Sequence, residues 1–320
     1  MDYISKENIK QFLDVHYNLK AKSIDPLESG IQNLNYLVLT DKCKFVFRLY
    51  NWKSIEELRY TIQILHSLQN DNFPSPELIL TINNEYSSCF HKKPCILYRY
   101  INGERLEETS VDTMKQLGLL QGKMHKILMK ERNDTSVLTW DFDNLLQLIS
   151  ENKELLLRSG FPKISNRLDY VAGELRKMPF PDLLPKGGTH QDIKPENVLI
   201  NTNQISGIID FDNGYYGDLL HDVTTTISWF CFRDTRLDLR FVDGFISSYQ
   251  KERELSAIEK KYFNQSIKFR LLREAIIWPM YVSHNIPIAE KCSDYFLTLY
   301  NNYNISEAEL LEHINWKSDK

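Results

Sequence analysis

Two carboxylates and one amide lie close together in the sequence between residues 192 and 210. Asp192 and Asn197 share one polar segment, and an apolar run follows Asn197. After a polar turn, a second apolar run ends at Asp210. This pattern predicts a loop, a strand, a tight turn and a second strand, which would bring the three side chains within reach of one another. Such a set suits ATP-dependent phosphoryl transfer, because one carboxylate can orient the attacking hydroxyl while an amide oxygen and a second carboxylate hold Mg²⁺ against the phosphates.

Asp192 is the predicted catalytic residue, since its carboxylate could accept a hydrogen bond from the substrate hydroxyl and aim that group at the γ-phosphate. The alternative is a capped turn, because Asp, Pro and Asn are favoured in turns. Lys194 joins the predicted catalytic set as a contact to the γ-phosphate, with a solvated lysine as the alternative. His190 could be a general base, but we favour a structural histidine that supports the loop, because Asp192 already fills the chemical role.

Three further carboxylates follow this segment. Asp212 could help to orient Mg²⁺ or could form hydrogen bonds to the loop. Asp218 and Asp222 lie one helical turn apart at the start of a predicted helix. We expect them to cap this helix and to brace the loop.

A polar turn near the N-terminus is the predicted phosphate-binding segment. It begins at Gly30, contains Asn33 and Asn35, and lies between two predicted strands. It has too few glycines for a GxGxxG loop. Polar side chains and free backbone N–H groups between two strands can nevertheless cover the phosphates of ATP.

Arg48 lies on the second of these strands and is the predicted basic contact to the phosphates. The alternative is an arginine on the surface of the strand. Glu57 lies near the start of the next predicted helix and could pair with Arg48, with Glu56 as the competing choice.

The hydrophobic pattern divides the chain into two predicted lobes. Ser5 is expected to cap a first helix, strands are predicted near 36–40, 45–50, 78–80 and 94–101, and a second helix begins at Ser54. We interpret residues 1–101 as a small nucleotide-binding lobe of helices and strands. Residues 102–320 are predicted to form a catalytic and substrate-binding lobe, with helices from Val111, over 143–157 and 164–176, and from 219 to about 313.

Composition excludes several classes of protein. A net charge of −4 gives no sign of nucleic-acid or membrane-surface binding. No apolar run reaches the roughly 18–20 residues that a transmembrane helix needs, and the first residues do not have the pattern of a signal peptide. The 5 cysteines are scattered, which predicts free thiols in a reducing, cytoplasmic compartment. The sequence makes no prediction of the oligomeric state.

Together these segments resemble the aminoglycoside phosphotransferase-like kinases, which share the protein-kinase fold, and among them most closely the homoserine kinases of that fold. The likeness covers most of the chain, and the stretches that carry it are 30–36, 57–60, 184–190 and 206–211. It implies an α+β, bilobal, protein-kinase-like fold, with a small β-rich N-terminal lobe and a larger helical C-terminal lobe.

The resemblance also implies roles for individual residues. Asp192 would be the catalytic base or hydroxyl orienter, and Asn197 and Asp210 would be the Mg²⁺ ligands. Arg48 would take the place of the phosphate-binding lysine of other kinases. Residues 98–101, including Tyr98 and Tyr100, would be the hinge that forms hydrogen bonds to adenine.

The chain also departs from the patterns of these families. Gln191 replaces a glycine that many members have, and Thr61 lies where many relatives have the paired glutamate. Phe211-Asp212 replaces the Phe-Gly of protein kinases, no Ala-Pro-Glu follows, and only 11 residues separate Asp210 from Asp222. This leaves little room for a protein-substrate platform.

We therefore predict an ATP- and Mg²⁺-dependent enzyme that phosphorylates a hydroxyl group of a small molecule, homoserine or a similar amino alcohol. The alternatives are an aminoglycoside phosphotransferase, a protein kinase, and a non-catalytic nucleotide-binding protein of kinase fold.

Overall fold

The chain forms two compact units, each built from two stretches of sequence. A computed structural model describes residues 4–27, 33–131, 141–158, 164–178, 180–281 and 286–316. The first unit combines Met1–Leu106 with Glu196–Gly214, and the second combines Glu107–Pro195 with Tyr215–Lys320. The predicted boundary after residue 101 therefore lies near the end of the first stretch. Segment 196–214, which we predicted in the second lobe, belongs to the first unit.

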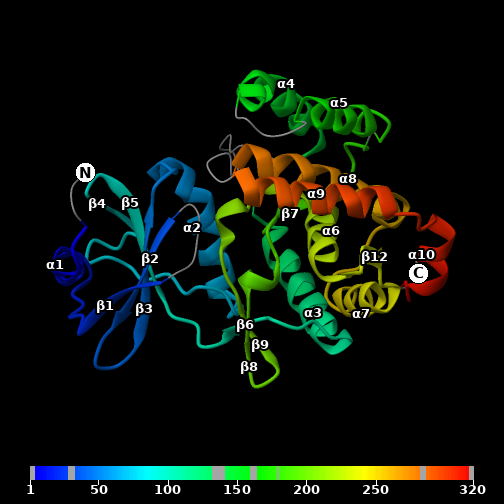
Figure 1. Ribbon diagram of the computed structural model, residues 1–320. Helices are drawn as coiled ribbons and strands as arrows, with labels where there is room; N and C mark the ends of the chain where they lie inside the picture. Colours follow the sequence, from blue (N-terminus) through cyan, green and yellow to red (C-terminus); the bar gives the residue numbers. More distant parts are fainter. Residues whose placement is uncertain are drawn as a thin grey trace. The chain divides into compact units, whose positions relative to one another are not determined.

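A five-stranded antiparallel sheet is the centre of the first unit, with the strand order β1-β2-β3-β5-β4. Figure 1 shows α1 and α2 on opposite sides of these strands. The bounds are α1 Lys6–Tyr17, β1 Ser23–Leu27, β2 Asn33–Leu39, β3 Lys44–Tyr50, α2 Ile55–Asn70, β4 Ser87–Phe90 and β5 Lys93–Arg99.

The apolar side chains of β3 explain which face of the sheet α1 covers. As predicted, the hydroxyl of Ser5 caps α1 by accepting the N–H of Asn8. The buried face of α1 packs in one cluster with Phe45, Phe47 and Leu49. Because successive side chains of a strand point to opposite faces, Arg48 must point away from α1. The sheet thus separates a mainly apolar layer from a face that carries a charged residue.

A second, three-stranded sheet completes the first unit, with the order β6-β8-β9. It contains β6 Glu104–Arg105, β8 Val198–Asn201 and β9 Gln204–Ile208, flanked by short 3₁₀ turns at Pro195–Asn197 and Phe211–Asn213. Val198 pairs with Ile208. The predicted hairpin is therefore confirmed.

The predicted strand at 78–80 is wrong. Only Leu78 forms a β-bridge, to Tyr98. The N–H of Thr81 already bonds to the carbonyl of Glu85, so the chain turns before a strand can form.

The second unit is mainly helical. In Figure 1, α8 and α9 run side by side, and α6 also packs against α8. The helices are α3 Val111–Leu128, α4 Phe142–Arg158, α5 Ile164–Leu175, α6 Leu219–Phe230, α7 Leu239–Tyr249, α8 Ala257–Tyr281, α9 Ile286–Asn302 and α10 Glu307–His313. Two short strand pairs accompany them, β7 Lys186–Gly188 with β10 Tyr216–Asp218 and β11 Phe232–Arg233 with β12 Arg236–Leu237. Within the described ranges, no helix is long and apolar enough to cross a membrane.

Glycine makes the contact between α3 and α7 possible. A Cβ atom at Gly118 would overlap the carbonyl of Phe245, and one at Gly122 would lie 2.6 Å from the carbonyl oxygen of Tyr249. These two glycines therefore allow α3 and α7 to approach each other closely. This contact brings α7 next to the helix that carries His125.

Candidate active site

Arg48 is the centre of a charged cluster within the first unit. Its Nη2 lies 2.7 Å from Oδ1 of Asp210 and 2.9 Å from Oδ2 of Asp212. The guanidinium also lies over the ring of Tyr50, at 5.5 Å from its centroid. Arg48 is only 8% exposed. This burial argues against the alternative of a surface arginine.

The two carboxylates keep Arg48 charged in spite of its burial. Desolvation alone would lower the pKa of its guanidinium, but the negative charges of Asp210 and Asp212 outweigh this effect and raise the pKa well above its ordinary value. A buried guanidinium needs such partners, because an unpaired charge in the interior is strongly unfavourable. Arg48 therefore provides a fixed positive charge next to Asp210.

The predicted pair of Arg48 with Glu57 is not what the structure shows. Glu57 forms a capping box at the start of α2: its carboxylate accepts the N–H of Ser54 at 2.6 Å, and its own N–H donates to Oγ of Ser54 at 3.2 Å. Thr61, one turn later, is buried. The first turn of α2 thus uses its glutamate to satisfy backbone groups, and Arg48 takes its carboxylates from the segment after β9.

Asp212 also connects the first residue of β2 to this cluster. Its carboxylate accepts hydrogen bonds from Nδ2 of Asn33 at 2.9 Å and from the hydroxyl of Tyr50 at 3.1 Å, and its backbone carbonyl accepts from Lys53. Asp212 is therefore the residue on which β2, β3 and the following loop converge. Of the two roles considered for it, hydrogen bonding to its surroundings is the one the contacts support.

Asn197 and Asp210 lie next to each other because of the β8–β9 hairpin. The N–H of Ile209 donates to the carbonyl of Asn197 at 2.9 Å, one residue beyond the pair Val198–Ile208. Asp210 has a left-handed backbone with φ of 70°, and its side chain does not cap the 3₁₀ turn that follows. This conformation is costly for a residue other than glycine and is often found at functional sites. The hairpin thus brings together the two predicted Mg²⁺ ligands.

Asp192 and Lys194 contact each other within the second unit. Nζ of Lys194 lies 2.9 Å from Oδ2 of Asp192, and both side chains are mostly buried. The same ammonium lies 5.9 Å from the ring centroids of both Trp229 and Trp278. Lys194 is therefore not the solvated lysine of the alternative interpretation. It is placed by one carboxylate and two aromatic rings.

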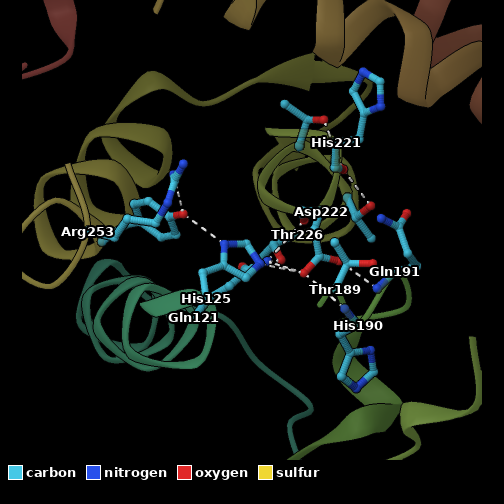
Figure 2. A network of polar contacts seen from close by, with 12 residues as sticks. Gln121, His125, Thr189, His190, Gln191, His221, Asp222, Thr226 and Arg253 are labelled. Carbon is cyan, nitrogen blue, oxygen red and sulfur yellow. Dashed lines mark hydrogen bonds and ion pairs between the residues drawn. The ribbon is translucent and has the colours of Figure 1, made fainter. Parts of the chain in front are cut away.

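Asp222 holds the backbone of His190 and Gln191, the two residues directly before Asp192, and Figure 2 shows these contacts. The carboxylate of Asp222 accepts the backbone N–H groups of His190 at 3.1 Å and of Gln191 at 2.5 Å. It also contacts Nε2 of His125 at 2.8 Å and accepts from Nε2 of Gln121 at 3.1 Å. The predicted bracing role of Asp222 agrees with these contacts. His190 is fully buried, and its Nδ1 accepts the N–H of Asp192, so it acts as a support of the loop.

Electrostatics favour an ionised Asp222 beside a neutral His125. Burial alone would raise the pKa of Asp222, but the hydrogen bonds from His125 and from the N–H of Gln191 bring this pKa below its ordinary value. Burial lowers the pKa of His125, and Asp222 offsets only part of that shift. Burial and the charges of Arg273 and Lys186 lower the pKa of His221 to about 3.

Sequence reasoning missed His125 and its extension to α7. Nδ1 of His125 lies 2.7 Å from the hydroxyl of Tyr249, which accepts from Nη1 of Arg253 at 2.9 Å. The signal in the sequence was a histidine next to Met124 on the apolar face of a predicted helix. A polar residue in that position needs a buried partner, but the sequence alone does not name that partner.

The remaining predicted nucleotide contacts are placed as follows. Asn35 pairs with Arg48 in the β2–β3 register. Tyr98 lies on β5 near Arg48. Burial raises the pKa of the Tyr98 phenol, and the positive charge of Arg48 offsets part of this increase. Tyr100 follows β5, and its N–H donates to the carbonyl of Lys44. Gly30 lies outside the described residues.

A protein-family comparison agrees with this geometry. The model of the phosphotransferase enzyme family matches residues 23–255. The chain belongs to this family. The enzyme is also similar to homoserine kinases. The one from Bartonella henselae is 24% identical over 262 residues, which cover 80% of each chain. The one from Neisseria meningitidis serogroup B is 25% identical over 270 residues, which cover 81% of this enzyme and 84% of the relative.

Solved structures give the fold. The amicoumacin kinase hAmiN matches the enzyme with a TM-score of 0.71 at 12% identity, over 93% of this chain and 94% of that one. A microcompartment-associated aminopropanol kinase matches with a TM-score of 0.66 at 18% identity, over 92% and 95%. These likenesses confirm the predicted α+β, protein-kinase-like fold. Together with the family they identify the enzyme as an ATP-dependent phosphotransferase whose acceptor is a small-molecule hydroxyl group.

Proposed function

We propose that this enzyme phosphorylates the hydroxyl group of homoserine or a similar amino alcohol in an ATP- and Mg²⁺-dependent reaction. The observation that carries the proposal is the loop of Asp192, whose backbone is held by a fully buried carboxylate while its own carboxylate is paired with Lys194. The choice of acceptor is supported by the homoserine kinases, which match most of the chain. The aminopropanol kinase adds support at the level of the fold.

Asp192 is the proposed residue that accepts the proton of the substrate hydroxyl. In the reaction, the hydroxyl oxygen forms a bond to the γ-phosphorus of ATP, the bond from that phosphorus to the β–γ bridging oxygen breaks, and ADP leaves. Lys194, held beside Asp192, is proposed to offset the negative charge of the transferred phosphoryl group. A hydroxyl of the acceptor aimed by a fixed carboxylate reacts faster because its orientation is already set.

The proposed nucleotide site lies in the first unit. Arg48 supplies a buried positive charge for the phosphates, and Asn33 is connected to the same cluster through Asp212. Gly30 stays part of the proposed phosphate-covering segment, and Asn35 lies on β2, which follows it. Glu57, predicted as a nucleotide-site residue through its pair with Arg48, is left with its capping role. Tyr98 and Tyr100 remain the proposed contacts near adenine. The solved hAmiN structure holds AMP-PNP, which supports a nucleotide site in this fold.

Asn197 and Asp210 are the proposed Mg²⁺ ligands, and the donor set fits that ion. Both residues offer oxygen, which Mg²⁺ prefers, and the side chain of Asp210 is 34% exposed although it pairs with Arg48. Within the described residues, no group of three or more His, Cys, Asp or Glu could hold a metal on its own. When bound, Mg²⁺ would neutralise charge that develops on the phosphates.

The test is a measurement of ADP release from Mg-ATP with L-homoserine, 1-amino-2-propanol, ethanolamine, choline and spectinomycin as acceptors. We expect one amino alcohol to give a strong response. Spectinomycin as the strongest acceptor would favour an antibiotic-modifying enzyme, and no response from any acceptor would contradict the proposal.

An Asp192→Asn variant tests the assignment of the catalytic residue with the acceptor that responds. The kcat should fall about 10²–10⁴-fold because the proton acceptor is lost, while the KM for ATP changes little. An unchanged kcat would show that Asp192 is not the catalytic residue.

A further inference from the structure

The residue directly before Asp192 has an unusual backbone and an unusual set of contacts. Gln191 lies in the left-handed region with φ of 65° and is 2% exposed. This conformation favours glycine, because a Cβ atom crowds the neighbouring carbonyl. A buried glutamine here persists only if its surroundings hold it in place.

Two arginines of α8 provide such contacts. Nη2 of Arg270 donates to the backbone carbonyl of Gln191 at 3.2 Å, and Nη1 of Arg273 donates to its side-chain Oε1 at 2.8 Å. Both arginines are almost fully buried, with exposures of 1% and 3%. They lie three residues apart and therefore on one face of α8. That face is directed at the loop before Asp192.

The two arginines do not have the same surroundings. Arg270 also pairs with Glu274 at 2.9 Å on its own helix. For Arg273 the contact to Gln191 is a specific, charge-assisted hydrogen bond between two buried side chains that are 82 residues apart in sequence. Loss of either side chain would leave the other buried with a polar group unsatisfied.

The role of Arg273 differs from that of Asp222. Asp222 accepts backbone N–H groups, and any residue type except proline at position 191 would provide one. Arg273 instead contacts the side chain and therefore requires an acceptor at that position. The backbone of residue 191 determines the direction in which the chain enters Asp192.

We propose that Arg273 is a positioning residue that holds the side chain of Gln191 and thereby fixes the direction of the Asp192 carboxylate. This rests on the proposed function, in which Asp192 accepts the proton of the acceptor hydroxyl. A residue of α8, 82 residues from Gln191 in the sequence, would then help to align the reacting groups.

The test compares Arg273→Met, Gln191→Ala and the double variant, with kcat and KM measured for Mg-ATP and the responding acceptor. Each single variant should lower kcat about 10–100-fold, because small displacements of a catalytic group are costly, while the KM for ATP stays within about twofold. The double variant should be no slower than the slower single variant, because both remove one interaction. Gln191→Glu keeps an acceptor oxygen for Arg273 and should retain most of the kcat.

Two controls separate positioning from a general loss of structure. Arg167 is a buried arginine of α5 that pairs with Ser293 and Asp294, so Arg167→Met should lower the melting temperature and leave kcat unchanged. Asp192→Asn is measured in parallel. A normal kcat in Asp192→Asn would refute the role of Asp192 on which the inference rests, whereas no response from any acceptor would refute the proposed function.

Three results would contradict the positioning role of Arg273. If Asp192→Asn is inactive but Gln191→Ala keeps its kcat, Arg273 does not act through Gln191. Additive losses in the double variant would also overturn it. If Arg273→Met does not fold, the comparison of Gln191→Ala with Gln191→Glu decides, and an equal loss of kcat in both would count against the proposal.

Discussion

The cluster around Arg48 and the network around Asp222 both depend on aspartate carboxylates, but these carboxylates have different surroundings. In the first, carboxylates pair with a buried guanidinium, and the side chain of Asp210 remains 34% exposed. In the second, the Asp222 carboxylate is completely buried and accepts hydrogen bonds from the backbone of the catalytic loop and from α3. One carboxylate is accessible from solvent, and the other is enclosed by the protein.

This difference separates the binding of ligands from the maintenance of geometry. A partly exposed ion pair can exchange partners, because water and arriving ions replace what is lost. A buried carboxylate with several donors cannot do so without leaving those donors unsatisfied. We therefore expect changes at Asp222 to disturb the whole loop, and changes around Arg48 to affect mainly the nucleotide.

Asp222→Asn should have the largest effect. An amide offers one oxygen and one N–H₂ group, so at least one donor among His190, Gln191 and His125 would then face another donor. We expect a loss of about 3–5 kcal/mol in the free energy of unfolding, as for a broken buried pair, and a fall of about 10²-fold in kcat. Urea denaturation and steady-state kinetics measure the two effects.

Ser228→Ala is the matched control, since Ser228 is buried on the same helix and donates to the nearby carbonyl of Thr225. It should cost about 1 kcal/mol and leave kcat unchanged. Equal effects of the two variants on kcat would contradict the assigned role of Asp222.

Asp212→Asn should have the next largest effect, because it leaves the buried Arg48 with a single carboxylate. We expect the KM for ATP to rise about tenfold, since Arg48 and Asn33 lose their common anchor. The exposed pair of Lys6 with Asp25 provides the control, and Asp25→Asn should change neither KM nor stability. A higher KM in Glu57→Ala with a normal KM in Asp212→Asn would restore the original pairing of Arg48 with Glu57.

The buried histidines should make the second unit sensitive to acid. The pKa of His221 is about 3 in the folded chain and 6.5 ordinarily, so the unfolded chain takes up the proton first as the pH falls. Stability that is fully present above about pH 6.5 is therefore lost towards pH 3, by at most about 1.4 kcal/mol per pH unit.

His221→Phe tests this, because the ring lies between Phe180 and Phe269 and a phenyl group fills a similar space. Its melting temperature should fall less than that of the wild type between about pH 7.5 and about pH 5. The exposed His91→Gln is the control and should leave the difference as in the wild type. An unchanged acid sensitivity of His221→Phe would refute the prediction.

The smallest effect should come from the cap of α2. Ser54→Ala removes the hydroxyl that accepts the N–H of Glu57 and should cost about 1 kcal/mol in the free energy of unfolding. The equivalent variant Ser306→Ala removes the same motif from α10 and should cost a similar amount. Neither should change kcat. A marked loss of kcat in Ser54→Ala alone would connect the start of α2 to the chemistry.

Local patterns were sufficient to predict much of the fold. The hairpin after Asn197, the caps at Ser5 and Ser54 and the helix from Val111 follow from residue order, because turn types, caps and periodicity act over a few residues. The bracing by Asp222 was also predictable, since it lies shortly after the loop that it supports.

Partners far apart in sequence could not be predicted. Arg48 was expected to pair with Glu57 near the start of the next helix, but its carboxylates lie 162 residues away or more. Similarly, nothing in the sequence around Gln191 indicates that α8 supplies its arginine. Such pairs depend on how the elements pack. Many acidic and basic residues have similar neighbours in the sequence, so the sequence does not show which of them will meet.

The two-segment construction of the first unit has a consequence for the order of synthesis. A growing chain completes all five strands of the sheet, and with them Arg48, before Asp210 and Asp212 have been translated. During that interval the guanidinium lacks the carboxylates that neutralise it in the finished enzyme, which disfavours its burial. No single cut of the polypeptide yields this unit whole. A stand-alone nucleotide-binding fragment would have to be made by joining residue 106 through a linker to residues 196–214.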